Sequence, residues 1–172
     1  MRKRILRYAA LGAVTTCILF AAKVTTDYDH SADFGQYHTY SWERVKAGDQ
    51  LWADRITRDV DQQLSAKGWQ KVESGGDVAV TGFGSTKEQP TLNTFYDGFG
   101  GWRWGGFGET TTTVTNTPVG TLVVDMFDAR TKHLIWRGMS AETLSGKPEK
   151  NENKLADAVK DMFKKFPPPA KS

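Results

Sequence analysis

Two helix-forming segments lie in a chain otherwise made of short β-rich segments, and this pattern limits the folds that the chain can adopt. Residues 51–67 carry an apolar side chain at every fourth position: Trp52, Ile56, Val60 and Leu64. This spacing predicts an amphipathic helix with a single apolar stripe. Asp49 is a suitable N-cap, and Gly68 can take the left-handed conformation that ends a helix. Such a helix must bury its stripe against another layer of structure.

Residues 154–166 form the second predicted helix. Its apolar face consists of Leu155, Val159, Met162, Phe163 and Phe166. Three prolines at 167–169 end it, because proline cannot continue the helical hydrogen-bond ladder. The predicted strands are residues 23–29, 37–42, 69–73, 77–84, 110–117, 119–127 and 133–144. Most are joined by short turns, so we expect an α+β fold: a mostly antiparallel β-sheet with two amphipathic helices packed on one face.

Residues 1–22 have the organisation of an export signal. Four basic residues and no acid occupy positions 1–7, and an apolar run follows over residues 8–22. The run is short for a membrane span, which needs about 20 apolar residues. We therefore interpret residues 1–22 as a signal peptide or N-terminal membrane anchor, with exported residues 23–169 forming a single α+β domain. The protein is then expected in the periplasm or cell envelope.

The net charge depends on this segment. The chain has 23 Lys and Arg against 20 Asp and Glu, and without the four basic residues near the start 19 remain against 20. The exported part is thus close to neutral, which removes the main support for nucleic-acid binding.

Cys17 is the single cysteine of the chain, so no disulfide can form within it. The tetrapeptide ending at Cys17 faintly resembles a bacterial lipobox, in which the cysteine is acylated. Cys17 is therefore a possible lipidation site. The favoured interpretation is that Cys17 is one more apolar residue of the signal.

Several short motifs, taken in order, resemble one bacterial family. They are Val24-x-x-Asp27-Tyr28-Asp29, Ala32-Asp33-Phe34, Tyr37-x-Thr39-Tyr40-x-Trp42, the run from Gly120 to Asp125, Asp128-Ala129, the run from Leu134 to Gly138, and Phe166-Pro167-Pro168. The set resembles the bacterial domain-of-unknown-function family 4136, over nearly all of residues 23–169. The resemblance implies an α+β fold and an envelope location, with members mostly described as lipoproteins. It implies no catalytic residue.

Motifs for catalysis or metal binding are missing from the sequence. Three histidines, His30, His38 and His133, lie in separate segments without the spacing of metal ligands, so we expect no metal and no cofactor. No nucleophile motif occurs. Three nearby carboxylates, Asp27, Asp29 and Asp33, support a hydrolase alternative if they converge in one cleft, but turn capping is the favoured interpretation.

Asp125 and Arg137 each interrupt an apolar strand, on either side of a predicted turn at 128–132. An acid on a half-buried sheet needs a partner. We therefore expect these two residues to form a structural ion pair across the hairpin.

Residues 97–108 form a Gly/Trp-rich loop, predicted to be the tip of a long hairpin. The side chains that set it apart are Phe99, Trp102, Arg103, Trp104 and Phe107. Exposed aromatics can stack on sugars, insert at a lipid interface or anchor a protein partner, whereas the alternative is that they cover the sheet. We expect a non-catalytic envelope domain whose loop binds an envelope protein, a glycan or a membrane surface. A hydrolase and a purely structural membrane-anchored domain are the alternatives.

Overall fold

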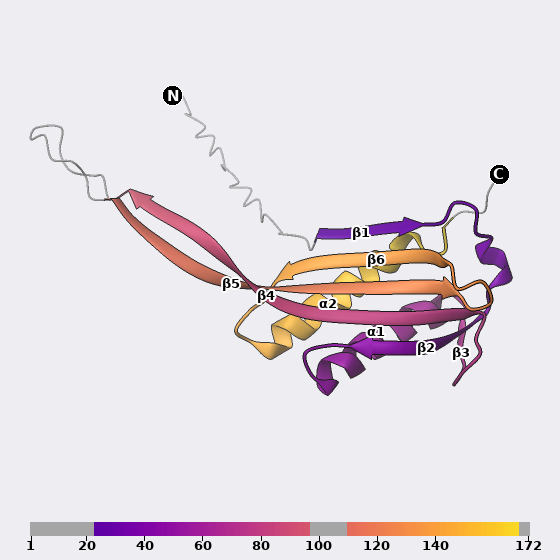
Figure 1. The fold of residues 1–172 in the computed structure, drawn as a ribbon. Helices are drawn as coiled ribbons and strands as arrows, with labels where there is room; N and C mark the ends of the chain where they lie inside the picture. Colours follow the sequence, from indigo (N-terminus) through magenta and orange to yellow (C-terminus); the bar gives the residue numbers. More distant parts are fainter. Residues whose placement is uncertain (1–22, 97–109, 169–172) are drawn as a thin grey trace, which may run out of the picture.

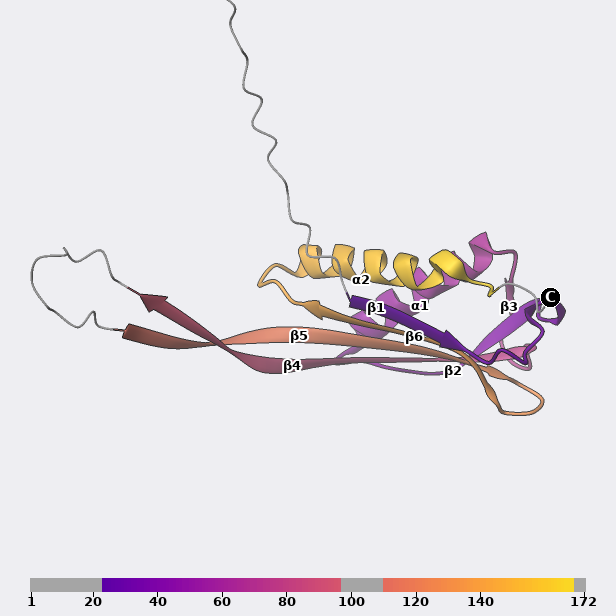
Figure 2. The same cartoon turned by 90° about the horizontal axis from the view of Figure 1, so that it is seen from above.

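The structure is a computed structural model that describes residues 23–96 and 110–168. Within them, six strands form one sheet in the order β1-β6-β5-β4-β2-β3 (Figure 1). The strands are β1 (Lys23–Tyr28), β2 (Thr39–Lys46), β3 (Gln70–Lys71), β4 (Val78–Tyr96), β5 (Thr110–Asp128) and β6 (Leu134–Thr143). Two helices, α1 (Gln50–Ala66) and α2 (Pro148–Met162), lie side by side on one face, as Figure 2 shows. The α+β fold predicted from the sequence is confirmed.

Strand direction follows from the connections. The pairs β1–β6, β6–β5 and β5–β4 are antiparallel, whereas β2 runs parallel to both β4 and β3. The exception arises because α1 carries the chain back along the sheet after β2, and a crossover through a helix joins parallel strands. The two short 3-10 helices, η1 (Phe34–Gln36) and η2 (Phe163–Lys165), lie before β2 and after α2.

Helix α1 forms as its sequence predicts. The Asp49 side chain accepts a hydrogen bond from the Trp52 amide at 2.9 Å, which is the expected N-cap. Gly68 ends the helix region with φ +85°, a conformation that glycine adopts without strain. Val60 and Leu64, on the apolar stripe, are fully buried beneath the sheet.

Helix α2 begins at Pro148, six residues before the predicted start at Lys154. Proline is suited to the first turn of a helix, where its missing N–H has no partner to lose. The prediction was wrong here because residues 149–153 are all polar and lack the apolar spacing that marks a buried face. The helix ends at Met162, and Phe163 and Phe166 then complete the buried face.

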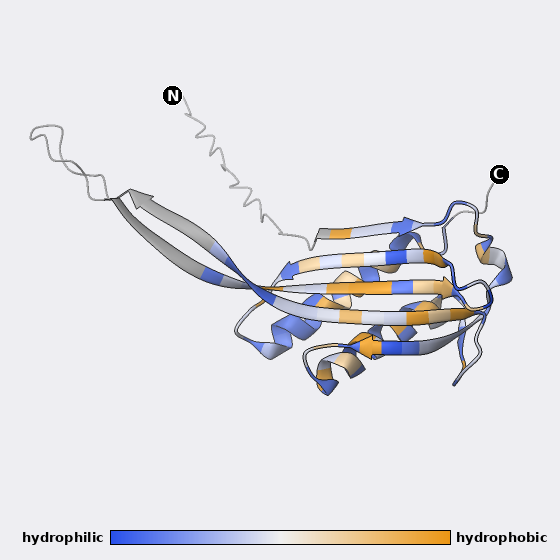
Figure 3. Cartoon of the chain, viewed as in Figure 1, coloured by the Kyte–Doolittle hydropathy of each residue, from blue (hydrophilic) through white to orange (hydrophobic). Residues whose placement is uncertain are grey.

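The core lies between the helices and the sheet. On β4 and β5 the side chains that face the helices are Val78, Val80, Val124 and Met126. At the η1 end of the sheet an aromatic cluster completes the core, with Phe166 in ring contact with Phe34, Trp69, Trp136 and Phe163. Figure 3 shows hydrophobic residues concentrated on β5 and on parts of the neighbouring strands β4 and β6.

Strands β4 and β5 are much longer than predicted. Each has 19 residues, and β5 passes without a break through Pro118, where two separate strands were expected. Pro118 instead marks the end of a pairing: its carbonyl accepts a hydrogen bond from Leu144 at 2.8 Å, and the β5–β6 register stops beside it at Val119. Proline has no N–H to continue that ladder. Two other strands differ less from their predicted bounds: β2 runs from Thr39 to Lys46 rather than over 37–42, and β3 has only two residues rather than the five of 69–73.

Candidate functional site

The outer parts of β4 and β5 form a two-stranded ribbon, here called the β arm: residues 88–96 paired with residues 110–118. The arm begins where the register of β6 with β5 ends. Nine residues of strand give it a length of roughly 30 Å. Figure 1 shows that it runs beyond both helices, away from the body of the domain.

The predicted binding residues follow directly on the arm in the chain. Phe99, Trp102, Arg103, Trp104 and Phe107 belong to the connection between β4 and β5 and lie outside the described residues, as does Cys17. What the structure describes is the pair of strands that lead into and out of this connection, ending at Tyr96 and Thr110.

A cavity of about 220 Å³, here called the helix–sheet cavity, lies near the base of the arm between the sheet and the first turns of both helices. Its apolar wall comes from Ile56 on α1, Leu155 and Ala158 on α2, and Leu122 on β5. The residues Gly48 and Thr86 at its rim are exposed, so the cavity opens to the surface at this end.

The cavity exists because side chains on the helix-facing side of the sheet become small toward the arm. Along β4 that side presents Val78 and Val80, and then Gly82 and Gly84. Gly84 lines the cavity, and a Cβ atom added there would lie 3.0 Å from Ile56 Cδ1. Across the neighbouring strands, Ser140 of β6 also lines the cavity in place of a larger apolar residue.

Lys154 and Glu142 form the charged part of the cavity wall. The Lys154 Nζ lies 3.3 Å from Glu142 Oε1 and donates a hydrogen bond of 2.6 Å to the carbonyl of Thr143. Asn151, one turn before Lys154, accepts from the Ser145 amide and donates to the Ser145 carbonyl, each at 2.7 Å. These contacts tie the end of β6 to the start of α2 and hold the Lys154 side chain at the cavity.

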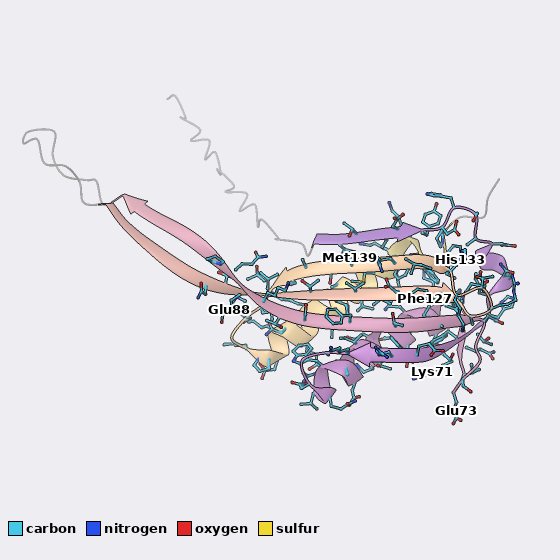
Figure 4. All side chains as sticks on the ribbon, viewed as in Figure 1. Lys71, Glu73, Glu88, Phe127, His133 and Met139 are labelled. Atoms are coloured by element: carbon cyan, nitrogen blue, oxygen red, sulfur yellow. The ribbon has the colours of Figure 1, made fainter. Side chains whose placement is uncertain are left out.

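On the opposite face of the sheet, which no helix of the described chain covers, Asp125 and Arg137 lie opposite each other on β5 and β6. Two hydrogen bonds of 2.6 Å join the guanidinium to the carboxylate. The carboxylate raises the pKa of Arg137 above its usual value. Asp27 of β1 is the register neighbour of Arg137 on its other side. The same face exposes Phe83 and Met139, the latter labelled in Figure 4.

The three carboxylates of the hydrolase alternative serve local backbone contacts. Asp27 accepts from the Tyr28 amide, Asp29 from the Ser31 amide and hydroxyl, and Asp33 caps η1 by accepting from the Gly35 amide. The hydroxyl of Ser31, followed by its amide, lowers the pKa of Asp29. None of the three lines the helix–sheet cavity. Asp29 and Asp33 therefore act as turn-capping residues, as the favoured interpretation expects, whereas Asp27 lies within strand β1.

A second hollow, of about 460 Å³, lies at the far end of the sheet from the arm and has a mostly polar lining. There the Tyr37 hydroxyl donates to Asp128 Oδ2 at 3.0 Å. Burial, and then this hydrogen bond, raises the pKa of Tyr37 to about 12. Asp77 accepts from the His38 and Thr39 amides and from the Thr39 hydroxyl, and these bonds lower its pKa. The polar groups are thus engaged in fixing the turns around β2.

Within residues 23–96 and 110–168, no group of three or more His, Cys, Asp or Glu side chains is arranged to hold a metal ion. His30 packs against Tyr28, with the ring centroids 4.3 Å apart. Over the same part of the chain, neither helix has the length and apolar content needed to cross a membrane.

The helix–sheet cavity was not predicted from the sequence. A signal was present in the change from Val78 and Val80 to Gly82 and Gly84 at alternate positions of one strand. The predicted strand ends at Gly84, whereas β4 continues to Tyr96, so the sequence pattern by itself does not place these glycines within a strand that faces a helix.

The family model described as Domain of unknown function (DUF4136) matches residues 24–168. No curated protein matches the chain. Among solved structures, a PDZ domain protein from Parabacteroides distasonis superposes with a TM-score of 0.61 at 12% identity, covering 88% of this chain and 37% of that chain. This chain therefore spans well under half of the length of that protein, and at this identity the likeness shows the fold alone.

Two further solved structures have lower scores. The dodecamer of a PelC variant from Paraburkholderia phytofirmans has a TM-score of 0.48 at 11% identity, covering 83% of this chain and 96% of that chain. A minor lipoprotein from Acinetobacter baumannii has a TM-score of 0.36 at 13% identity, covering 76% of this chain and 92% of that chain.

Proposed function

The chain belongs to the family described as Domain of unknown function (DUF4136), and on that premise we propose that it is an exported cell-envelope protein that binds rather than catalyses. In this proposal residues 23–169 form one domain, and the Gly/Trp-rich segment 97–108 is its contact element. The contacting side chains are Phe99, Trp102, Arg103, Trp104 and Phe107.

The observation that carries this proposal is the β arm. Its strands continue for nine register pairs beyond the last pair of β5 with β6. A two-stranded ribbon is only marginally stable in water by itself. A ribbon of this length places Tyr96 and Thr110, the described residues that flank segment 97–109 in the sequence, far along the arm from the core. This favours a role in contact with another surface.

The aromatic content of segment 97–108 supports the same role. Trp and Phe gain the most free energy when an interface buries them, and Arg is also enriched among residues that dominate binding. An envelope protein partner, a glycan and a membrane surface each offer a complement to these side chains. The basic and apolar organisation of residues 1–22 is what supports export to a compartment where such surfaces occur.

The hydrolase alternative loses its support because Asp27, Asp29 and Asp33 are engaged in separate local contacts. The alternative of a purely structural anchored domain depends on the N-terminus. Mass spectrometry of the mature protein distinguishes cleavage after Ala21 or Ala22, acylation at Cys17, and no cleavage. Acylation or no cleavage, together with a dispensable segment 97–108, would favour the structural alternative.

The test replaces residues 98–108 with a two-residue Asn-Gly turn, so that the arm keeps a hairpin connection. We expect the variant to fold and to lose its co-purifying envelope partner, its binding to isolated envelope glycan, or its sedimentation with lipid vesicles. Which of the three is lost identifies the surface.

A matched control removes exposed apolar side chains elsewhere. Phe83→Ser and Met139→Ser alter two exposed residues on the helix-free face and leave segment 97–108 intact. This control should retain all binding. Unchanged envelope retention and unchanged partners in the 98–108 variant would refute the proposed contact role.

A further inference from the structure

The helix–sheet cavity plays no part in the contact role described above, and it has the composition of a ligand site. We propose that it binds a single fatty acyl chain, with the hydrocarbon inside and the carbonyl oxygen beside Lys154. This site is independent of segment 97–108, so either inference can fail without the other.

The wall of the cavity is suited to hydrocarbon. Ile56, Leu122 and Ala158 are buried core residues that face it, and Leu155 adds a partly buried aliphatic side chain. Apolar atoms form the larger part of the exposed lining, and they offer water few polar partners. An apolar ligand gains free energy by leaving water for this cavity.

The size of the cavity also fits such a ligand. Its volume is about 220 Å³. Apolar cavities of about 150 Å³ already bind benzene. Because the rim at Gly48 and Thr86 is exposed, a chain can enter by its methyl end while its head group stays outside.

Lys154 supplies a polar contact for the head group. An ammonium has three N–H donors, and in the described structure two of them are directed at Glu142 and the Thr143 carbonyl. The third is available to a carbonyl or carboxylate oxygen. Glu142 balances the lysine charge, so an ester carbonyl and a free carboxylate are both acceptable partners.

The experiment uses the protein purified with the N-terminus that its cell produces. Decanoate is the probe for a free fatty acid, monomeric dioctanoylphosphatidylcholine is the probe for a lipid, and acetate controls for the head group alone. Amide NMR spectra should show that at least one acyl probe shifts signals around the cavity, including Ser140, Leu144 and Leu155, whereas acetate does not. The acyl probe that binds identifies the source of the chain.

Variants then locate the site. Ser140→Leu places a large side chain into the cavity, and Ala141→Leu places the same side chain on the other face of the same strand. We expect Ser140→Leu to weaken binding by about tenfold or more, and Ala141→Leu to leave it unchanged. Ala47→Leu fills the cavity from the opposite wall and serves if Ser140→Leu does not fold. Lys154→Met keeps the apolar stem, removes the donor and should weaken decanoate binding.

Three results would overturn the proposal. They are no binding of either acyl probe, equal binding by wild type and both cavity-filling variants, and signal shifts confined to the helix-free face around Phe83 and Met139. Equal affinity of Lys154→Met and wild type for decanoate would refute the head-group contact.

Discussion

Asp125 on β5 and Arg137 on β6 form a two-point ion pair, with Oδ1 to Nε and Oδ2 to Nη2 both 2.6 Å. The two side chains are not equally accessible, because Asp125 is 14% exposed and Arg137 is 45% exposed. Removing one partner therefore has a different consequence for each. The half-exposed guanidinium can be hydrated when it loses Asp125, whereas the more buried carboxylate cannot be hydrated as fully when it loses Arg137.

We predict that Arg137→Ala destabilises the fold by about 1–3 kcal/mol, because a partly buried acceptor is left unpaired. Asp125→Ala should cost less, about 1 kcal/mol or below, as for surface pairs. Urea unfolding of both variants and of the double variant measures the two losses and their coupling. If the two single variants lose equal unfolding free energy, and the double variant loses the sum of the two, the ion pair does not stabilise the sheet through the contact between these side chains.

The sequence predicted this pair because each charge interrupts an apolar strand on one side of a short turn. It also predicted α1, whose cap, apolar stripe and terminal glycine all agree. A long hairpin around residues 97–108 was predicted, with residues 110–117 as one strand, but the length and pairing of the β arm were not. The predicted partner strand stops at Gly84, and the Thr-rich residues 110–117 show no apolar alternation that would set their length or pairing. The start of α2 was missed because residues 149–153 are all polar. The helix–sheet cavity was missed because it depends on contacts between distant segments, such as Ile56 with Gly84, which a local pattern does not predict.

Asp61 joins helix α1 to strand β2. Its Oδ1 atom accepts hydrogen bonds of 2.8 Å from both the Tyr40 hydroxyl and the Trp42 indole N–H. Burial, and then the bond to Asp61, raises the pKa of Tyr40 above its usual value. Asp61→Ala leaves both donors without this acceptor and should destabilise the fold by about 2–4 kcal/mol.

Asp61→Asn is the informative companion, because its amide oxygen can still accept both bonds. It should cost clearly less than Asp61→Ala in the same unfolding measurement. Asp54→Ala, on an exposed position of the same helix, is the matched control and should have little effect. A similar loss in all three variants would indicate a general effect on α1 rather than the loss of these two hydrogen bonds.

Asp77 gives the fold a dependence on pH. Bonds from the His38 and Thr39 amides and the Thr39 hydroxyl lower its pKa in the folded state. A group with a lowered folded pKa stabilises the fold fully above its unfolded pKa, about 3.9, and this contribution is lost as the pH falls through the folded value. The stability difference between wild type and Asp77→Asn should therefore be largest near neutral pH and shrink below about pH 4.

Denaturant unfolding from pH 7 to pH 2 measures that difference. Glu88→Gln, which alters an exposed carboxylate at the base of the arm (Figure 4), is the control. Its unfolding curve should follow wild type at each pH. A difference for Asp77→Asn that stays constant down to pH 2 would mean that the three hydrogen bonds do not favour the charged carboxylate.

Strand β4 belongs partly to the body of the sheet and partly to the β arm, so the stability of the two parts can be compared within one strand. Residues 78–83 lie between β2 and β5, whereas residues 88–96 pair with β5 beyond the end of the β5–β6 register. Strand segments with few buried contacts open at a lower free energy than the core. We therefore predict that amide hydrogens in residues 88–96 exchange much faster than those that pair within residues 78–83. Hydrogen exchange followed by mass spectrometry or NMR measures both segments in one sample.

Equal protection along the whole strand in the isolated protein would show that the arm is stabilised within one chain. That result would remove the argument that the length of the arm favours an external contact.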